Sequence, residues 1–437
     1  MSWYWAFSLL VGMVLALMAL GVPVAFAFLL TNLVGVLFFM GGLSGVTQLV
    51  ANSADAVASF HLAPLPLFVL MGEMFFHSGL AVRVFDSLDM LFGRVRGRLS
   101  YLTVAGGTVF ATLSGSSLAN GALLGSLMVP EMLRRGYKRY MAFGPILGTG
   151  GLAMIIPPST LAVLLGSLAG IDIGALLVAG ILPGFLLALF YVVLIFIQVR
   201  LDPDAAPAYD TERVSWNVAI RSFALNVLPM GLVVFCVVGL ILLGVATPTE
   251  AAAFGVFGVM VLCLLFRAPL IQTIQRSLLA TIRVSASILL IVMGSAIFSQ
   301  LLAFSGASAG LIKWTTSFDV APFVILLSMF FVLLLLGMFM EQISIMMLTV
   351  PVFFPLAGSL GYDLVWFGVI VLLGLEIGLA TPPLGLLLFV LHGVAPKGTT
   401  LEQVAWAAVP YIGCALLLVA LIMVFPPIAL YLTQFVR

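Results

Sequence analysis

Charged residues are scarce in this sequence. They make up 8% of its 437 residues, whereas a soluble domain carries about 25%. Hydrophobic residues make up 63%, so we expect an integral membrane protein surrounded by a lipid bilayer. The formal net charge is only +1, which gives no reason to expect nucleic acid or an acidic protein as a partner.

Side chains that bind metals or form disulfides are also few. Each of Cys236, Cys263 and Cys414 stands alone in an apolar run and is expected to act as a small hydrophobic residue. The three histidines are scattered without the spacing of a metal site. We find no nucleophile beside a base and no phosphate-binding loop. We therefore expect neither an enzyme nor a transporter that uses ATP.

A polar interruption between two apolar segments is the most informative stretch. The first segment, Leu99 to Leu113, reaches a polar tip at Ser114 to Ser117, and the second returns to a basic cluster. As a helix, the first arm would be about 22 Å long, short of the hydrocarbon core of about 30 Å. Its length and polar tip favour a re-entrant hairpin, although the basic residues at both ends would also fit two full crossings.

The next apolar segment, from about Arg139 to Leu168, contains Pro157-Pro158. Two successive prolines interrupt a helix and leave backbone groups without partners. Such groups are tolerated at membrane depth where they line a protein-buried or watery site. A hairpin tip that faces a broken helix therefore predicts a binding site, and a simple proline kink is the alternative.

This pattern occurs twice in the chain. Matching residues recur at two spacings, 221 and 225, and we expect the extra four residues in the connection after the hairpin. Corresponding interruptions in two hydrophobic halves are typical of a transporter's binding site. The pairs are Asn120 with Glu341, Pro130 with Pro351, Tyr137 with Tyr362, and Pro157-Pro158 with Pro382-Pro383.

The predicted fold is an all-α polytopic membrane protein with two repeats. Each repeat has five crossings, one re-entrant helical hairpin and one discontinuous helix, and an odd number of crossings makes the repeats inverted. The first repeat covers 1–200, with scaffold spans in 1–60, transport elements in 62–168 and a closing span at 173–199. A charged cytoplasmic linker at 201–222 precedes the second repeat, 223–437, with a hairpin at about 322–357 and a broken helix at 364–391.

The basic residues predict the orientation. If the first hairpin enters from the cytoplasm, 15 of the 17 basic residues are cytoplasmic, and only Lys313 and Arg437 lie outside. This is the asymmetry of the positive-inside rule. Both termini are then periplasmic, and the second hairpin enters from the outer side. An error of one span would change this distribution in the second half.

Three glutamates lie within apolar sequence: Glu73, Glu341 and Glu376. Because a charge in the bilayer is costly, each is a candidate for handling an ion or proton, and bonding to freed backbone amides is the structural alternative. The hairpin tips and helix breaks have no Lys or Arg. An anionic substrate would therefore rely on helix N-termini, and clustered neutral oxygens would suit a cation such as Na⁺.

The chain resembles the large membrane subunit of tripartite ATP-independent periplasmic (TRAP) transporters, which is DctM-like and part of the ion-transporter superfamily. The resemblance covers nearly the whole chain and is specific because several long motifs occur in one order. These motifs are PLFVLMGEMF (66–75), LSGSSLAN (113–120), IIPPS (155–159), ILPG (181–184), TPTEAAA (247–253), LGMFME (336–341) and EIGLATPPLG (376–385).

The resemblance implies Na⁺-coupled uptake of an organic acid across the bacterial inner membrane. It implies two partners, a small four-helix membrane subunit and a periplasmic substrate-binding protein, and an elevator-type movement of the hairpins and broken helices. A stand-alone Na⁺- or H⁺-coupled carboxylate carrier without a binding protein stays an alternative. A third possibility is an ion-conducting or exchange protein in which the three glutamates relay protons.

The resemblance also implies two or more Na⁺ ions, held mainly by backbone carbonyls. The first site would comprise Ser114, Ser116, Ala153, Ile156 and Pro158, and the second Gly337, Gly378, Thr381 and Leu384. Candidates near the substrate are Ser117, Asn120, Ser159 and Glu341, and the buried carboxylates are Glu73 and Glu376. The sequence departs from the family pattern at Ala153, where many relatives have glycine, and near Glu341, where aspartate is common.

Overall fold

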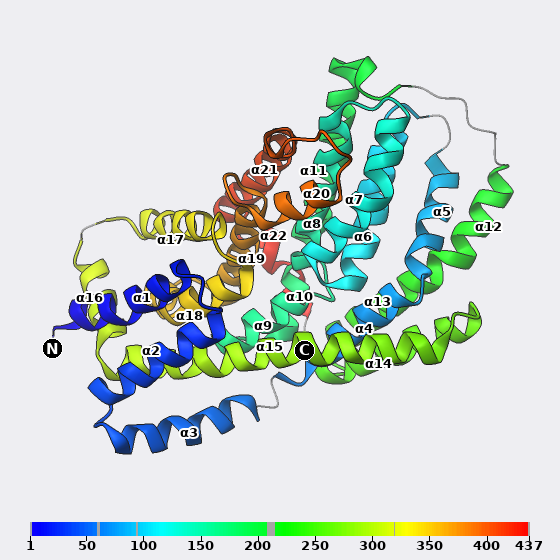
Figure 1. Cartoon of the computed structure of the whole chain (residues 1–437). Coiled ribbons are helices and arrows are strands. Elements are labelled where there is room, and N and C mark those ends of the chain that lie inside the picture. The colour runs from blue at the N-terminus through cyan, green and yellow to red at the C-terminus, as the bar shows by residue number, and fades with distance from the viewer. Residues whose placement is uncertain (1, 59–61, 93–94, 208–214, 319, 436–437) are drawn as a thin grey trace.

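The computed structural model describes residues 2–58, 62–92, 95–207, 215–318 and 320–435 (Figure 1). Within these residues the chain is helical, without a β-strand. The first helices are α1 (Trp3–Ala19), α2 (Val24–Phe39), α3 (Leu43–Val57), α4 (Pro64–His77), α5 (Leu80–Phe92), α6 (Arg98–Ser114), α7 (Ser117–Arg134), α8 (Arg139–Ile155), α9 (Thr160–Ala169), α10 (Ile173–Ala179) and α11 (Ile181–Leu201). The short 3₁₀ segment Pro203–Ala205 follows α11.

The second group of helices begins in the predicted linker. It comprises α12 (Trp216–Asn226), α13 (Leu228–Leu242), α14 (Pro248–Leu265), α15 (Leu270–Phe304), α16 (Ala307–Ser317), α17 (Pro322–Gly337), α18 (Gln342–Ser359), α19 (Leu364–Ala380), α20 (Leu386–Val394), α21 (Leu401–Val424) and α22 (Pro427–Leu430). The 3₁₀ segment Leu432–Phe435 ends the described chain, so Arg437, which was expected outside the membrane, lies beyond the described residues.

Local sequence explains where the critical helices begin. Ser116 caps α7 by accepting a hydrogen bond from the Ala119 amide, and Asp363 caps α19 by accepting from two backbone amides. Gly115, between α6 and α7, has a φ of 59°, a left-handed conformation that glycine adopts without strain. The tight tip of the first hairpin therefore follows from the Ser-Gly-Ser sequence.

The described helices fit a multi-pass membrane protein. Five are long and apolar enough to cross a bilayer, and up to eight spans result if each of three bent helix pairs counts as one. The bent pairs are α4–α5, α8–α9 and α12–α13, with angles of 65°, 44° and 40°. Large apolar side chains such as Phe185, Phe196 and Phe235 are exposed on the outside, where lipid would solvate them.

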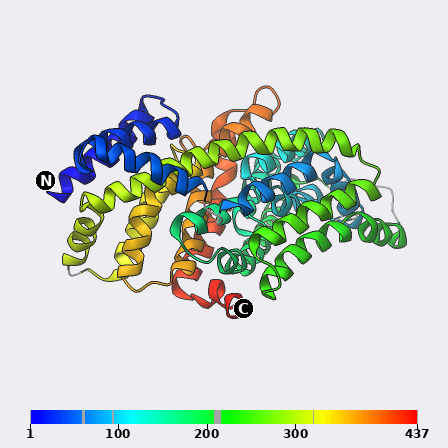
Figure 2. The same cartoon turned by 90° about the horizontal axis from the view of Figure 1, so that it is seen from below.

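The helices α8 and α19 form the centre of the molecule. Every residue from Met141 to Ile155 is buried, and so is every residue from Trp366 to Ala380. In Figure 1, α6 and α7 lie on one side of this pair and α17 and α18 on the other. The N-terminal helices α1 and α2 lie near α16 and α17 in both views, and α12 to α14 lie at the opposite end (Figures 1 and 2).

One long helix connects the two ends of the molecule. The 35-residue α15 packs against α2, α3, α4 and α18 (Figure 2). Its backbone accepts a hydrogen bond of 2.7 Å from the Asn32 side chain at the carbonyl of Gly294. α15 therefore joins N-terminal helices to the second hairpin.

Two pairs of helices, one from each half, share a register of 225. Both α7 and α18 have 18 residues and begin 225 apart, at 117 and 342, and both α8 and α19 have 17 residues and begin 225 apart. Pro130 then corresponds to Pro355 instead of Pro351, and Ser116 instead of Asn120 corresponds to Glu341. The predicted spacing of 221 is wrong within the hairpin, because α18 carries prolines at both 351 and 355.

Candidate functional site

The tip of the first hairpin lies against the break between α8 and α9. A Cβ added to Gly115 would be 2.8 Å from the Thr160 hydroxyl and 3.6 Å from the Pro158 carbonyl oxygen. This contact brings Ser116 next to the break that contains Ile156, with Ala153 in the last turn of α8. The predicted members of the first Na⁺ site thus come from two adjoining segments, the tip of the first hairpin and the break after α8. The side chain of Ser114, another predicted member, lies outside the described part of the structure.

The second hairpin contacts the second broken helix even more closely. A Cβ added to Gly337 would be 2.5 Å from the Gly378 Cα, so the two backbones touch where both residues are glycine. Thr381 follows α19, and its hydroxyl donates to the Ile377 carbonyl oxygen at 2.5 Å. Leu384 lies in the same break, and its side chain is exposed. We therefore expect its backbone, and not its side chain, to contribute to a site beside Thr381. The structure therefore brings the second predicted set together.

Both breaks leave backbone oxygens outside regular helix. In the first, the Ser159 hydroxyl donates to the Met154 carbonyl oxygen at 2.6 Å and accepts from the Ala162 amide to begin α9. In the second, the Gly385 amide donates to the Thr381 carbonyl oxygen at 3.2 Å. Proline supplies no amide hydrogen, so these segments are richer in acceptors than a continuous helix.

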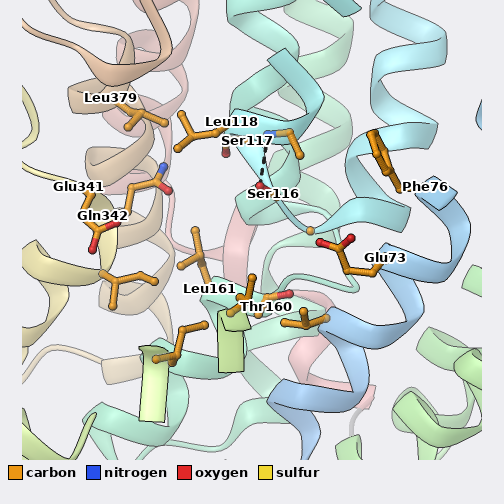
Figure 3. A pocket seen from close by; sticks show the side chains of 17 residues that line it. Glu73, Phe76, Ser116, Ser117, Leu118, Thr160, Leu161, Glu341, Gln342 and Leu379 are labelled. Atoms are coloured by element: carbon orange, nitrogen blue, oxygen red, sulfur yellow. Dashed lines mark hydrogen bonds between the residues drawn. The ribbon is translucent and has the colours of Figure 1, made fainter. Parts of the chain in front are cut away.

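A cavity of about 240 Å³ lies between the two hairpin tips (Figure 3). Its wall includes residues from α4, α7, α9, α15, α18 and α19. None of the lining residues that the structure describes is Lys or Arg. The polar lining residues are Glu73, Ser116, Ser117, Thr160, Glu341 and Gln342.

Two of the predicted glutamates stand on opposite walls of this cavity, Glu73 from α4 and Glu341 at the start of α18 (Figure 3). The Glu73 carboxylate lies 3.3 Å from His77 Nε2, one helical turn away. Glu341 accepts a 3.1 Å hydrogen bond from the Ser344 hydroxyl, which holds it near the N-terminus of α18. Glu341 therefore lies beside the cavity, and its position near a substrate stays a prediction.

Glu376, the third glutamate, is buried behind the cavity. Its Oε2 atom accepts hydrogen bonds from the Ser117 hydroxyl at 3.0 Å and from Gln342 Nε2 at 3.2 Å. Asn120 is also buried and donates from Nδ2 to the Thr149 carbonyl oxygen at 3.0 Å, which fastens α7 to α8. Glu376 thus connects segments that are far apart in the sequence.

The predicted substrate-vicinity residues divide into two groups. Ser117 and Glu341 line the cavity, whereas Asn120 and Ser159 are fully buried and do not. Sequence reasoning missed Thr160 and Gln342, which do line it. The register of 225 pairs Gln342 with Ser117, so a correct alignment of the two halves could have identified Gln342.

Several known proteins similar to this chain are transporter permeases. Residues 11–428 match the family model described as "Tripartite ATP-independent periplasmic transporter, DctM component". A C4-dicarboxylate TRAP transporter large permease protein from Pseudomonas aeruginosa is 32% identical, over 90% of this chain and 93% of that protein. An ectoine TRAP transporter large permease protein from Halomonas elongata is 27% identical (97% and 98%), and a sialic acid one from Vibrio cholerae is 28% identical (96% of each chain).

Two solved transporter structures share the fold. The YdaH transporter of Alcanivorax borkumensis superimposes with a TM-score of 0.60 at 17% identity, over 88% of this chain and 90% of that one. MtrF of Neisseria gonorrhoeae, described as one of a class of antimetabolite efflux pumps, gives 0.61 at 13% identity, over 88% and 85%. At these identities the likeness shows the fold alone.

Proposed function

Because the chain belongs to the DctM family of tripartite ATP-independent periplasmic transporters, we propose that it imports an organic acid across the bacterial inner membrane by coupling to Na⁺. It is the large permease subunit in this proposal. The arrangement of the cavity between two hairpin tips and two broken helices is the observation that supports it most strongly.

Helix N-termini at the cavity favour a carboxylate substrate. The first turns of α7, α9 and α18 all contribute to the lining, through Ser117, Thr160 and Gln342 among others. The N-terminus of a helix presents amide hydrogens and the positive end of the helix dipole, which together attract anions. Three such termini can compensate for the lack of Lys and Arg among the described lining residues.

Na⁺ coupling would use the backbone oxygens of the two breaks. Na⁺ is a hard cation that prefers oxygen ligands, and the carbonyls around Pro158 and Thr381 lie outside regular helix. A Na⁺ ion on each side of the cavity would offset the charge of a bound carboxylate and of Glu341. Binding of cation and substrate would then support each other electrostatically.

Uptake into proteoliposomes tests the proposal. We expect the chain, reconstituted with a small four-helix membrane subunit and a periplasmic binding protein, to accumulate an organic acid when Na⁺ is outside. Replacing the Na⁺ gradient by a K⁺ gradient is the control and should abolish accumulation. Accumulation that is equal in both gradients would contradict Na⁺ coupling.

The same experiment separates the alternatives. Uptake by the chain without its two partners would favour a stand-alone carboxylate carrier. Uptake that follows a proton gradient and ignores Na⁺ would favour a protein in which Glu73, Glu341 and Glu376 relay protons. Glu73 and Glu341 line the cavity, and Glu376 is hydrogen-bonded to two other lining residues, Ser117 and Gln342. These positions are the observation that supports a proton relay as the second candidate.

A further inference from the structure

A single carboxylate oxygen accepts hydrogen bonds from both hairpins. Glu376 Oε2 receives the Ser117 hydroxyl at 3.0 Å and Gln342 Nε2 at 3.2 Å. Ser117 is the first residue of α7 and Gln342 is the first residue of α18, so each donor stands at a hairpin tip. The two tips are 225 residues apart in sequence and are joined through one atom of α19.

The close approach of α8 to α19 explains how the carboxylate reaches this position. A Cβ added to Gly151 would lie 2.7 Å from the Glu376 Cγ and 3.3 Å from its Cδ. The register of 225 pairs Gly151 with Glu376. Where these matched positions meet, only one can carry a large side chain, because the space beside Gly151 is filled by the stem of Glu376.

The burial of Glu376 is costly and its partners among the described residues are neutral. The residue is 5% exposed, and its Oε1 atom has no hydrogen-bond partner in the described part of the chain. A cavity of about 20 Å³ next to Glu376 is also bordered by Tyr411 of α21, whose hydroxyl likewise has no partner among the described residues. This volume suits one water molecule, which could bond to both groups.

Removing this acceptor would leave the buried Ser117 hydroxyl without its Glu376 bond and Gln342 Nε2 with Met154 Sδ at 2.9 Å as its remaining partner, which costs more than the bond itself. Replacing a buried charge by an apolar side chain of similar size can nevertheless leave stability unchanged. Fold stability alone therefore does not explain why this position carries a glutamate. A role in holding the two hairpin tips in one arrangement does explain it.

We propose that Glu376 is a positioning residue that fixes the two hairpin tips relative to each other, so that Na⁺ binding at one predicted site strengthens Na⁺ binding at the other. This inference rests on the proposed function. Ser117 directly follows Ser116 of the first predicted site, and Glu376 lies two residues before Gly378 of the second. A coupling between two sites typically changes affinity about 5- to 150-fold and acts equally in both directions.

The test compares Glu376→Leu with Glu376→Gln. Leucine fills the volume without an acceptor, and we expect the Na⁺ concentration for half-maximal uptake to rise about fivefold or more and the Hill coefficient to fall toward one. Glutamine keeps one oxygen that can accept from both donors, so it should restore most of the cooperativity. An unchanged Hill coefficient in Glu376→Leu overturns the proposal, and so does a glutamine variant as defective as the leucine variant.

A distance measurement separates this inference from Na⁺ coupling itself. Spin labels at Ser126→Cys in α7 and Ser359→Cys in α18, both exposed, report the arrangement of the hairpins without Na⁺ once the native cysteines are replaced. We expect a narrow distance distribution with Glu376 or Gln and a broad one with Leu. Equal widths overturn the proposal. Wild-type uptake that ignores Na⁺ would instead defeat the proposed function.

Two further variants complete the design. If Glu376→Leu does not fold, Ser117→Ala combined with Gln342→Leu removes both donors and should broaden the same distance distribution; an unchanged width overturns the proposal. Tyr362→Phe is the control, because its ring packs 5.3 Å from that of Trp366 and does not border the cavity beside Glu376. It should leave the Hill coefficient and the distance distribution unchanged.

Discussion

The close contacts of the site depend on residues without side chains. Gly337 and Gly378 meet backbone to backbone, and Gly151 makes room for Glu376. Sequence reasoning identified Gly337 and Gly378 through a family motif, whereas the role of Gly151 follows only from the packing of α8 against α19. The sequence does not show which glycines are needed for close packing, because glycine also occurs at positions where a side chain would meet nothing within 4 Å.

We predict that Gly378→Ala separates the second hairpin from α19. The new Cβ would lie 2.6 Å from the Gly337 Cα, and neither backbone can move alone. Overpacking of this kind costs about 1–3 kcal/mol, so the melting temperature of the purified protein should fall. Gly393→Ala in α20 is the matched control, since nothing lies within 4 Å of its Cβ position. Equal melting temperatures for the two variants would contradict the close contact.

A second residue-level prediction concerns Thr381. We expect Thr381→Ala to raise the Na⁺ concentration for half-maximal uptake about fivefold, the equivalent of one hydrogen-bond-sized interaction of about 1 kcal/mol. Thr315→Ala is the control, because Thr315 makes the same type of bond to the carbonyl four residues earlier but lies in α16. An unchanged Na⁺ requirement, measured by uptake, would remove the Thr381 hydroxyl from the second site.

The helices and breaks around the site could be largely predicted from the sequence. Pro157-Pro158 and Pro382-Pro383 end α8 and α19 in the expected segments, because proline acts locally. The helix α5 was not predicted as a separate element, and Arg83, Asp86 and Asp89 interrupt its apolar residues. It forms because α12 packs against it, with Ser87 and Ser222 hydroxyls 2.8 Å apart. The apolar residues Leu80, Val84 and Leu88 recur at helical spacing and are buried, which is a local signal for this helix.

The junction between α8 and α11 gives a prediction for pH dependence. Asp202, just after α11, accepts hydrogen bonds from Lys138 at 2.5 Å and from the Tyr140 hydroxyl at 2.9 Å. The bond from Lys138, followed by that from Tyr140, holds the pKa of the Asp202 carboxyl below its usual value. A lowered pKa in the folded state stabilises the protein above the unfolded-state pKa, and this stabilisation is lost as the pH falls through the folded-state value.

We therefore expect Asp202→Asn to lower the melting temperature slightly near neutral pH, and the difference from the wild type to disappear in acid. Melting curves of the purified protein over a pH series provide the measurement. Asp55→Asn, exposed on α3, which packs against α2 and α15, serves as the charge-matched control. A difference that persists or grows in acid would show that the Asp202 contacts do not stabilise the fold in this way.

At the scale of the whole molecule, the sequence predicted the class of fold well. Hydrophobic content and paired interruptions indicated a helical membrane transporter, and the two similar transporter structures share that fold. The opposite orientation of the two repeats and an elevator-type movement stay predictions. The helices α7 and α18 have equal lengths, as do α8 and α19, but a membrane boundary is needed to assign the directions of the two halves.

Thiol labelling in intact cells would assign those directions. We predict that Lys313→Cys, at α16 before the second hairpin, reacts with a membrane-impermeant reagent from outside, and that Arg96→Cys, just before α6 of the first hairpin, reacts only in opened membranes. Both residues are exposed, so burial does not limit either reaction. Introducing each cysteine into a chain without Cys236, Cys263 and Cys414 provides the background control. Reaction of both positions from the same side would rule out the inverted arrangement.

The length of α15 has a consequence for the surrounding lipid. Its 35 residues form a rod of about 52 Å, far longer than a hydrocarbon core of about 30 Å. Arg276 and Arg283 are exposed on its N-terminal part, so that end belongs in the headgroup layer while the remainder slants through the acyl chains. A long helix adapts to a thinner or thicker bilayer by changing its tilt. A change in lipid acyl-chain length would therefore tilt α15 and shift the helices that pack against it.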